Sequence, residues 1–197
     1  MGIRAAGRKG LRFLSAVAIA GVIASAGGAE AGSPGYKRSV VRYDVPDVVL
    51  VNQDGARVRL KGLTEADKPV VLDFIYGTCT TICPVLSAGY TSLQGKLGPD
   101  TRKMRLISVS IDPEHDTPKV MKEYLKRFRA KPGWDFLTGS REDIDRVMQA
   151  FDSYVTDKMY HRQVTFIRAQ GPGEWIRIDG LLGSAELMSE IGKAGRK

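Results

Sequence analysis

Cysteine and histidine are scarce in this chain, which has two of each among its 197 residues. A closed structural zinc site takes four protein ligands, so such a site would need all of these side chains. A disulfide from Cys79 to Cys83 would close a very short loop, and the chain-entropy model gives such a loop about 2 kcal/mol at most. Neither reading explains the cysteines well, and we expect them to have a chemical role.

The chain also lacks a stripe of basic residues interleaved with aromatic ones, although its formal net charge is +8. Such a stripe is typical of a nucleic-acid-binding face, so we expect no nucleic-acid partner. The basic residues within 122–129 are expected to form the solvated face of one helix. A basic surface can still help the protein dock to acidic partners or anionic lipid head groups. No internal repeat or low-complexity linker divides residues 32–197, which are predicted to form a single domain.

The one long apolar run lies near the N-terminus. Basic residues within 4–12 precede it, residues 13–26 form it, and Ala29-Glu30-Ala31 follows. This order is typical of a secretory signal peptide, so residues 1–31 are predicted to be one. The alternative is an uncleaved N-terminal anchor that tethers the protein to the inner membrane. In both cases we expect an exported, periplasmic protein in an oxidising compartment.

Strand and helix patterns alternate along the rest of the chain. The valine-rich residues 39–51 predict an early strand, and residues 57–60 pair back after the Asn52-Gln53-Asp54-Gly55 turn as a β-hairpin. Continuous apolar residues at 69–76 and 104–111 predict buried parallel strands. Helices are predicted at 84–97, from Pro118 to before Pro132, after Ser140 and after Ser184. A short extended segment is predicted at 134–138, and residues 164–168 and 175–178 are predicted to form a hairpin around Gly171-Pro172-Gly173.

This order of elements is that of the thioredoxin fold, in which parallel crossovers are followed by an antiparallel pair and a last helix. The predicted fold class is therefore α/β and thioredoxin-like: a central mixed sheet flanked by helices, with an N-terminal β-hairpin elaboration. Local signals agree with this order, because Thr117 fits a helix N-cap and Pro118 fits the first helical position.

Both cysteines lie where a buried strand gives way to a helix, in Gly77-Thr78-Cys79-Thr80-Thr81-Ile82-Cys83-Pro84. Four residues apart at a helix start, the two side chains share one face, so their sulfurs can form a disulfide or clamp one ion. A helix N-terminus stabilises a thiolate, so we expect a lowered thiol pKa for Cys83. Two thiolates and one imidazole form a soft ligand set that suits copper, especially Cu(I).

The two histidines have different settings. His161 lies just before the strand predicted at 164–168. In a thioredoxin fold the loop that enters this strand faces the cysteines, so we favour His161 as a metal ligand. His115 lies in an acidic turn beside Glu114 and Asp116, and we interpret it as a solvent-exposed turn residue near a helix cap.

Taken together, these motifs resemble the Sco/SenC family. The resemblance covers nearly all of residues 32–197 and rests on residues 72–76, the C-x-x-x-C-P run at 79–84, residues 107–118, residues 134–139 and His161. It implies an exported, often membrane-tethered thioredoxin-fold protein that binds one copper ion, Cu(I) or Cu(II), through Cys79, Cys83 and His161. It also implies a metallochaperone rather than an enzyme.

The resemblance implies partners as well. The copper acceptor would be cytochrome c oxidase subunit two, whose copper site the family helps to assemble, and a thiol reductant would keep the cysteines reduced. Asp73 and Asp112-Pro113 match family positions and are interpreted as scaffold. Thr80 and Tyr160 depart from the family, since many members have proline and an acidic residue there, and we expect these changes to alter the tuning of the site.

Other functions remain open for the same residues. The main alternative is a thiol–disulfide oxidoreductase that reduces the cysteines of a partner apo-protein. The three residues between the cysteines, and Val164 where thioredoxins have a cis-proline, argue only against a general thioredoxin. Peroxidase activity is disfavoured because Tyr76 stands where that motif has proline. Copper-dependent redox sensing would use the same ligands as the metallochaperone.

Overall fold

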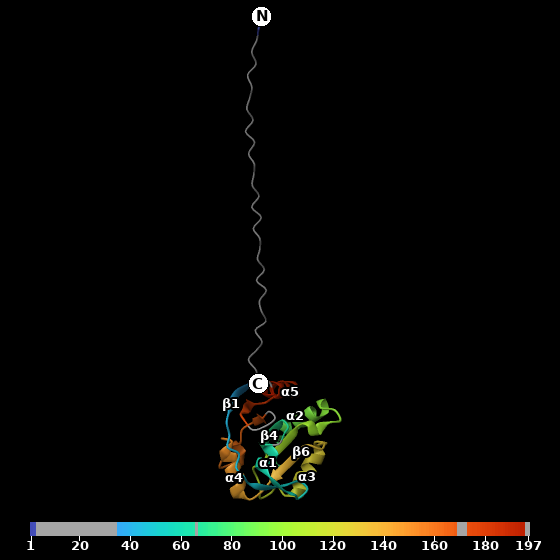
Figure 1. The fold of residues 1–197 in the computed structure, drawn as a ribbon, viewed down its shortest axis with the longest axis vertical. Coiled ribbons are helices and arrows are strands. Elements are labelled where there is room, and N and C mark those ends of the chain that lie inside the picture. Colours follow the sequence, from blue (N-terminus) through green and yellow to red (C-terminus); the bar gives the residue numbers. More distant parts are fainter. Residues whose placement is uncertain (3–34, 66, 169–172, 196–197) are drawn as a thin grey trace. The chain divides into compact units, whose positions relative to one another are not determined.

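The computed structural model describes residues 1–2, 35–65, 67–168 and 173–195 (Figure 1). Nearly all of the predicted signal segment 1–31 lies outside these residues, as do Gly171 and Pro172 of the predicted hairpin turn. Within the described ranges, no helix is both long enough and apolar enough to cross a membrane.

A mixed eight-stranded sheet forms the centre of the part that follows residue 34 (Figure 1). Its strand order is β1-β8-β7-β4-β5-β6-β2-β3. Strands β4, β5 and β6 are parallel, and the remaining pairs are antiparallel. The strands are β1 (Tyr36–Val41), β2 (Val49–Asn52), β3 (Arg57–Arg59), β4 (Val70–Ile75), β5 (Arg105–Ser110), β6 (Trp134–Thr138), β7 (Val164–Arg168) and β8 (Trp175–Gly180).

Helices flank this sheet, and the central strands are covered on both faces, since every residue of β4 is buried. The helices are α1 (Leu60–Thr64), α2 (Cys83–Lys96), α3 (Pro118–Arg127), α4 (Arg141–Ala150) and α5 (Ser184–Ala194), with short 3-10 turns at Thr101–Lys103 and Lys158–Tyr160. The predicted N-caps are confirmed: Thr117 Oγ1 accepts from the Val120 amide, and Ser140 Oγ accepts from the Asp143 amide.

The prediction of one early strand over 39–51 is wrong in its middle, because residues 42–48 form no strand. Pro46 lies there, and a proline has no N–H to donate to a sheet. The chain instead divides into β1, which pairs with β8 at one edge, and β2, which pairs with β6 near the other. The predicted hairpin of β2 and β3 is confirmed, but Leu60 begins α1 instead of extending β3.

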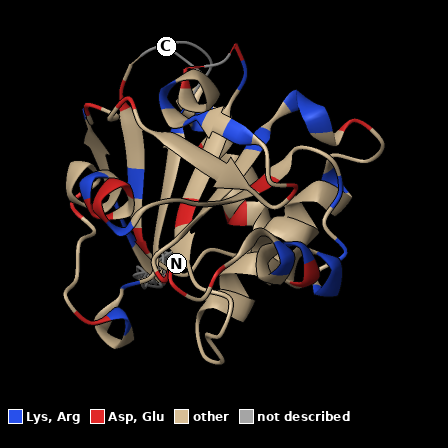
Figure 2. Ribbon diagram, turned by 90° about the horizontal axis from the view of Figure 1, so that it is seen from below, with Lys and Arg blue, Asp and Glu red and all other residues tan. Residues whose placement is uncertain are grey.

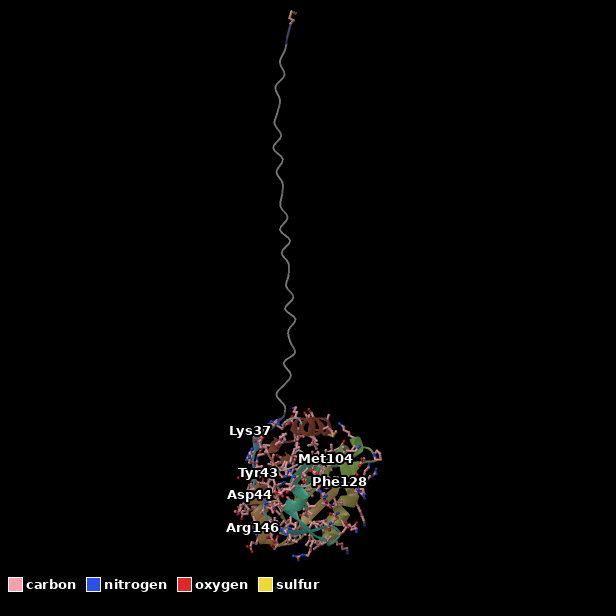
Figure 3. The ribbon with its side chains drawn as sticks, viewed as in Figure 1. Lys37, Tyr43, Asp44, Met104, Phe128 and Arg146 are labelled. Atoms are coloured by element: carbon pink, nitrogen blue, oxygen red, sulfur yellow. The ribbon has the colours of Figure 1, made fainter. Side chains whose placement is uncertain are left out.

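Aromatic side chains fill the core beside β4 and β7. The Phe151 ring is at the centre of this cluster. Its centroid lies 5.0 Å from that of Tyr43 (labelled in Figure 3), 4.9 Å from Phe166, 6.0 Å from Phe74 and 5.1 Å from Trp175. The ring pairs are tilted or edge-to-face, an arrangement that aromatic quadrupoles favour. This cluster fixes Phe74 near the end of β4, directly before the segment that carries the cysteines.

Lys and Arg positions alternate with Asp and Glu positions along the ribbon of the described residues (Figure 2). On α3, the basic residues Lys122, Lys126 and Arg127 are exposed, as predicted for a solvated helix face. Lys122 pairs with Asp54 and Lys126 pairs with Glu123, so part of this positive charge is locally compensated.

Candidate functional site

The two cysteines, which we call the dithiol pair, lie in the turn between β4 and α2. The Cys79 amide donates to the Tyr76 carbonyl at 3.2 Å, which folds the chain back just after β4. Cys83 is the first residue of α2, and Pro84 follows it in the first helical turn. Cys79 is 6 % exposed and Cys83 is wholly buried, and neither forms a disulfide.

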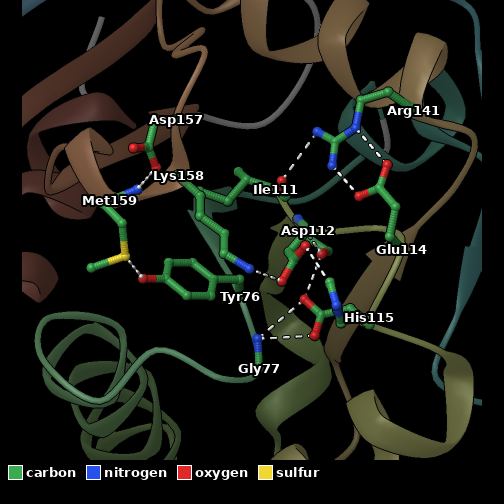
Figure 4. A network of polar contacts seen from close by, with 12 residues as sticks. Tyr76, Gly77, Ile111, Asp112, Glu114, His115, Arg141, Asp157, Lys158 and Met159 are labelled. Carbon is green, nitrogen blue, oxygen red and sulfur yellow. Dashed lines mark hydrogen bonds and ion pairs between the residues drawn. The ribbon is translucent and has the colours of Figure 1, made fainter.

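An aspartate from the neighbouring loop holds the start of this turn. The Gly77 amide donates to both carboxylate oxygens of Asp116, at 3.0 and 3.1 Å, and the Ser110 hydroxyl donates to the same carboxylate at 2.5 Å (Figure 4). A Cβ atom at Gly77 would lie 2.6 Å from Asp116 Oδ1, so the contact needs a residue without a side chain. Asp116 is completely buried, and it therefore fixes the turn from inside the protein.

The two thiols differ in their electrostatic surroundings. Burial by itself raises the pKa of Cys79, but hydrogen bonds from Cys83 and Thr81 outweigh it and lower the pKa from 9.0 to about 7. The Cys83 amide lies 3.4 Å from Cys79 Sγ, and Thr81 Oγ1 lies 3.7 Å from it. Burial and the neighbouring Cys79 raise the pKa of the Cys83 thiol well above its usual value.

The prediction that Cys83 has the lowered thiol pKa is therefore wrong, and the roles are exchanged. A helix N-terminus stabilises the anion at which its free amides point. Here the amide of Cys83, at the first residue of α2, donates to the sulfur of Cys79. The Cys83 sulfur itself lies in the core, where a thiolate loses its hydration.

His161 lies at the same end of the sheet, because β7 runs antiparallel to β4 and begins beside the end of β4. Its Nε2 lies 3.0 Å from the Phe74 carbonyl oxygen. A carbonyl can only accept, so Nε2 carries the proton and Nδ1 keeps the free lone pair. Burial lowers the pKa of His161 below its usual 6.5, and the imidazole is neutral at pH 7.

Tyr76 contacts both the dithiol pair and the segment of residues 158–161, which we call the histidine segment. Its ring meets the His161 ring edge-to-face at 6.0 Å. Its hydroxyl donates to Met159 Sδ at 3.7 Å (Figure 4). Burial, and then the neighbouring Cys79 thiol, raise the pKa of Tyr76 to about 12. Tyr76 therefore stays protonated at neutral pH and remains a hydrogen-bond donor.

A salt bridge also anchors the histidine segment. Lys158 Nζ binds the Asp112 carboxylate and lies 5.3 Å from the centre of the Tyr76 ring (Figure 4). Asp112 is 5 % exposed at its side chain and also lies 2.9 Å from His115 Nδ1. His115 is 66 % exposed, which agrees with the prediction of an exposed turn residue.

Asp73, which we interpreted as scaffold, lies in the middle of β4 and is completely buried. Burial raises the pKa of its carboxyl to about 7, an effect that Ser108 and Tyr90 partly oppose. The same carboxyl helps to raise the pKa of Cys83, so it lies close enough to the dithiol pair to act on it electrostatically.

The structure brings Cys79 and Cys83 together but does not join His161 to them in one cluster. Among the residues that the structure describes, no three Cys, His, Asp or Glu side chains are placed to hold a metal ion. The ligand set Cys79, Cys83 and His161 therefore stays a prediction. A cavity of about 210 Å³ adjoins His161 and is also lined by Phe74, Tyr154 and Val155.

Sequence reasoning missed the residues that support the site. Asp116 and Gly77 are 39 residues apart, and Lys158 and Asp112 are 46 residues apart, so no local pattern links the partners of either contact. The one available signal for Met159 was its position two residues before His161.

Comparison with known families gives one consistent result: the SCO1/SenC family model matches residues 45–169. Among curated proteins, the SCO1 protein homolog of Bacillus subtilis is 37 % identical over 118 residues, which is 58 % of this chain and 60 % of that protein. The protein SenC of Rhodobacter capsulatus is 28 % identical over 105 residues, 53 % of this chain and 46 % of that protein. The chain thus spans less than two thirds of the length of these relatives.

Solved structures show the same fold. BsSco, described as a member of the Sco family of cytochrome c oxidase assembly proteins with a disulfide switch, has a TM-score of 0.66 at 30 % identity, covering 80 % of this chain and 96 % of that chain. Arabidopsis thaliana ScoI, solved with copper bound, has a TM-score of 0.64 at 25 % identity, covering 77 % and 98 %. Together with the mixed sheet, these similarities confirm the predicted thioredoxin-like fold class.

Proposed function

Since the chain belongs to the SCO1/SenC family, we propose that it is a copper metallochaperone. It holds one copper ion and delivers it for the assembly of a respiratory oxidase copper site, with cytochrome c oxidase subunit two as the acceptor. The copper-bound Arabidopsis relative supports copper as the cargo, and the description of BsSco supports a role in oxidase assembly. The signal-like pattern of residues 1–31 supports a periplasmic location, with residues 32–197 as the copper-binding domain.

The observation that carries this proposal is a pair of free thiols, joined by a hydrogen bond from the Cys83 amide to Cys79 Sγ, with a neutral histidine at the same end of the sheet. Two thiolates and an imidazole nitrogen are ligands that Cu(I) prefers. We assign Cys79 Sγ, Cys83 Sγ and His161 Nδ1 as the ligands. Because His161 Nε2 is bound to the Phe74 carbonyl, Nδ1 is the ring nitrogen that is left for copper.

Copper uptake releases protons in this mechanism, because metal-bound cysteines are thiolates. Cys79 is already partly ionised near pH 7, whereas Cys83 keeps its proton until the ion displaces it. The affinity for Cu(I) should therefore fall as the pH is lowered. Oxidation of the pair to a disulfide removes both sulfur ligands, so a thiol reductant has to keep the site open.

The test is a titration of the reduced protein with Cu(I) against a competing chelator. We expect one tight equivalent that is lost in the Cys79→Ala and Cys83→Ala variants and strongly weakened in His161→Ala. His115→Ala is the matched control, since His115 is exposed and bound to Asp112, and it should bind like the parent protein. Tight binding that persists in Cys83→Ala would show that the ligand assignment is wrong.

The unequal thiols favour a second candidate, the thiol–disulfide oxidoreductase. Cys79 thiolate would attack a disulfide of a partner apo-protein, forming a mixed disulfide and releasing one partner thiolate. Cys83 would then lose its proton and attack Cys79 Sγ, so the pair is oxidised and the partner gains two thiols. Cys83→Ala should trap the mixed disulfide and Cys79→Ala should not. A reduction potential above that of the compartment's oxidants would argue against this role.

A further inference from the structure

The proposed sulfur ligands are not directly accessible from solvent. Cys83 is wholly buried in the core, and Cys79 is only 6 % exposed. A chaperone must nevertheless take copper from one protein and pass it to another, and each transfer exchanges one ligand at a time. A soft donor at the surface beside the pair would give the ion a first ligand on the way in and a last ligand on the way out.

Met159 is such a donor. It lies in the histidine segment and is 70 % exposed, and its thioether sulfur is 3.7 Å from the Tyr76 hydroxyl. Figure 4 shows this sulfur directed at the hydroxyl. The backbone of Tyr76 is bound to the dithiol pair as well, because its carbonyl oxygen accepts from the Cys79 amide at 3.2 Å. One residue therefore contacts both the exposed sulfur of Met159 and the residue that carries the more accessible sulfur of the dithiol pair.

The other methionines of the domain have a different setting. Met104, Met121 and Met148 are buried, and Met188 packs partly buried against the core. Single exposed apolar residues are common on proteins, so exposure alone would mean little. What distinguishes Met159 is that its sulfur accepts a hydrogen bond from Tyr76, the residue whose carbonyl binds the Cys79 amide.

The charges around Met159 also suit a cation. Lys158 precedes it, but the ammonium group of Lys158 is bound to the Asp112 carboxylate, which compensates its charge. Asp157 lies on the other side of Lys158, and its carboxylate accepts a hydrogen bond from the Met159 amide at 2.9 Å. The approach to the sulfur is therefore not dominated by positive charge.

We propose that Met159 is the handover ligand of the site: its thioether binds Cu(I) transiently as the ion enters or leaves the dithiol pair. The inference rests on the proposed copper function. The step is a ligand exchange in which Cu(I) keeps its oxidation state, a copper bond to Met159 Sδ forms and breaks, and a bond to Cys79 Sγ replaces it. A ligand used only in passage speeds entry and exit equally, so it leaves the equilibrium affinity unchanged.

The experiment compares the Met159→Leu variant with the parent protein. Leucine keeps the volume and apolar character of methionine but has no sulfur donor. Stopped-flow mixing with a coloured Cu(I) chelator measures the rate of uptake and of release, and equilibrium competition measures the affinity. We expect both rates to fall about tenfold and the affinity for Cu(I) to stay the same. A tenfold loss is the lower end of the loss in affinity or activity that follows when a group supporting a metal site is removed. Met188→Leu is the matched control and should change neither rate.

The possible outcomes are distinct. Unchanged rates in Met159→Leu would overturn the inference. A loss of affinity without equal slowing of uptake and release would also overturn it, because Met159 would then be a permanent ligand. If the parent protein bound no Cu(I), or if binding ignored Cys79→Ala, the proposed function itself would fail. A shift of the Met159 methyl resonance in NMR spectra on adding Cu(I) to a Cys79→Ala, Cys83→Ala double variant would support the handover role directly.

Discussion

The reactivity of the dithiol pair toward an alkylating reagent should depend on pH in a way that is specific to this site. Cys79 has a pKa lowered to about 7, and Cys83 has a raised pKa and a completely buried sulfur. Only thiolates are alkylated at an appreciable rate. Raising the pH from 6 to 9 should therefore switch on the alkylation of Cys79 with a midpoint near 7, while Cys83 stays unmodified.

The size of the change separates this profile from that of an ordinary cysteine. With a pKa of 7, the thiolate fraction rises about tenfold from pH 6 to pH 8 and then hardly changes to pH 9. With the unperturbed value of 9.0, it would rise about 90-fold from pH 6 to pH 8 and a further fivefold or so to pH 9. Cys79 is only 6 % exposed, which slows the absolute rate, so the shape of the profile is the diagnostic quantity.

Mass spectrometry after timed treatment with iodoacetamide measures each cysteine separately. Thr81→Val removes the hydroxyl 3.7 Å from Cys79 Sγ and should move the midpoint upward, whereas Thr80→Val changes an exposed neighbour and should not. In Cys83→Ala the backbone amide still donates to Cys79, so the midpoint should rise but stay below 9. A midpoint near 9 in the parent protein, or modification of Cys83 first, would refute the electrostatic reasoning.

Two further predictions concern stability. Gly77→Ala should lower the free energy of unfolding by about 1–3 kcal/mol because its Cβ would lie 2.6 Å from Asp116, whereas Gly89→Ala, in open space on α2, should raise it by about 0.5–1 kcal/mol. Urea unfolding measures both, and equal effects would contradict the packing argument. The pKa of Asp73 is about 7 when folded against 3.8 unperturbed, so the folded state holds a proton that the unfolded state releases in this range. The free energy of unfolding should therefore fall from pH 4 to pH 7, by up to about 4 kcal/mol. If the parent protein and the Asp73→Asn variant differed in this free energy by the same amount at every pH, the reasoning would be wrong.

The centre of the fold was predictable because its local signals agree with one another. Strands β4 and β5 are continuous apolar runs, and the start of α3 has both its N-cap Thr117 and Pro118 at the first position. Such signals act within a few residues, and the resulting elements then have few ways to pack. The break in the early strand had a local signal in Pro46, but only the tertiary structure sends β1 and β2 to opposite sides of the sheet.

The candidate site was predictable in its residue types but not in its supports. The spacing of Cys79 and Cys83 is visible in the sequence, and so is His161 before β7. The contacts of Asp116 with Gly77 and of Lys158 with Asp112 join distant segments, and a single sequence gives no sign of them. These buried acidic groups determine where the turn after β4 and the histidine segment lie.

The exchange of roles between the two thiols shows that the direction of the helix amides and the burial of each sulfur decide which thiol is ionised. Cys83 has the position in the chain that predicts a reactive thiolate, but position on a helix does not determine where the first amides point. In this turn the Cys83 amide points at Cys79, and the Cys83 sulfur is buried with Asp73 nearby. One thiol is therefore ready to bind or attack at neutral pH, and the other must first lose a proton. Copper loading and disulfide formation both require that second deprotonation, so both should be faster at higher pH through the same residue, Cys83.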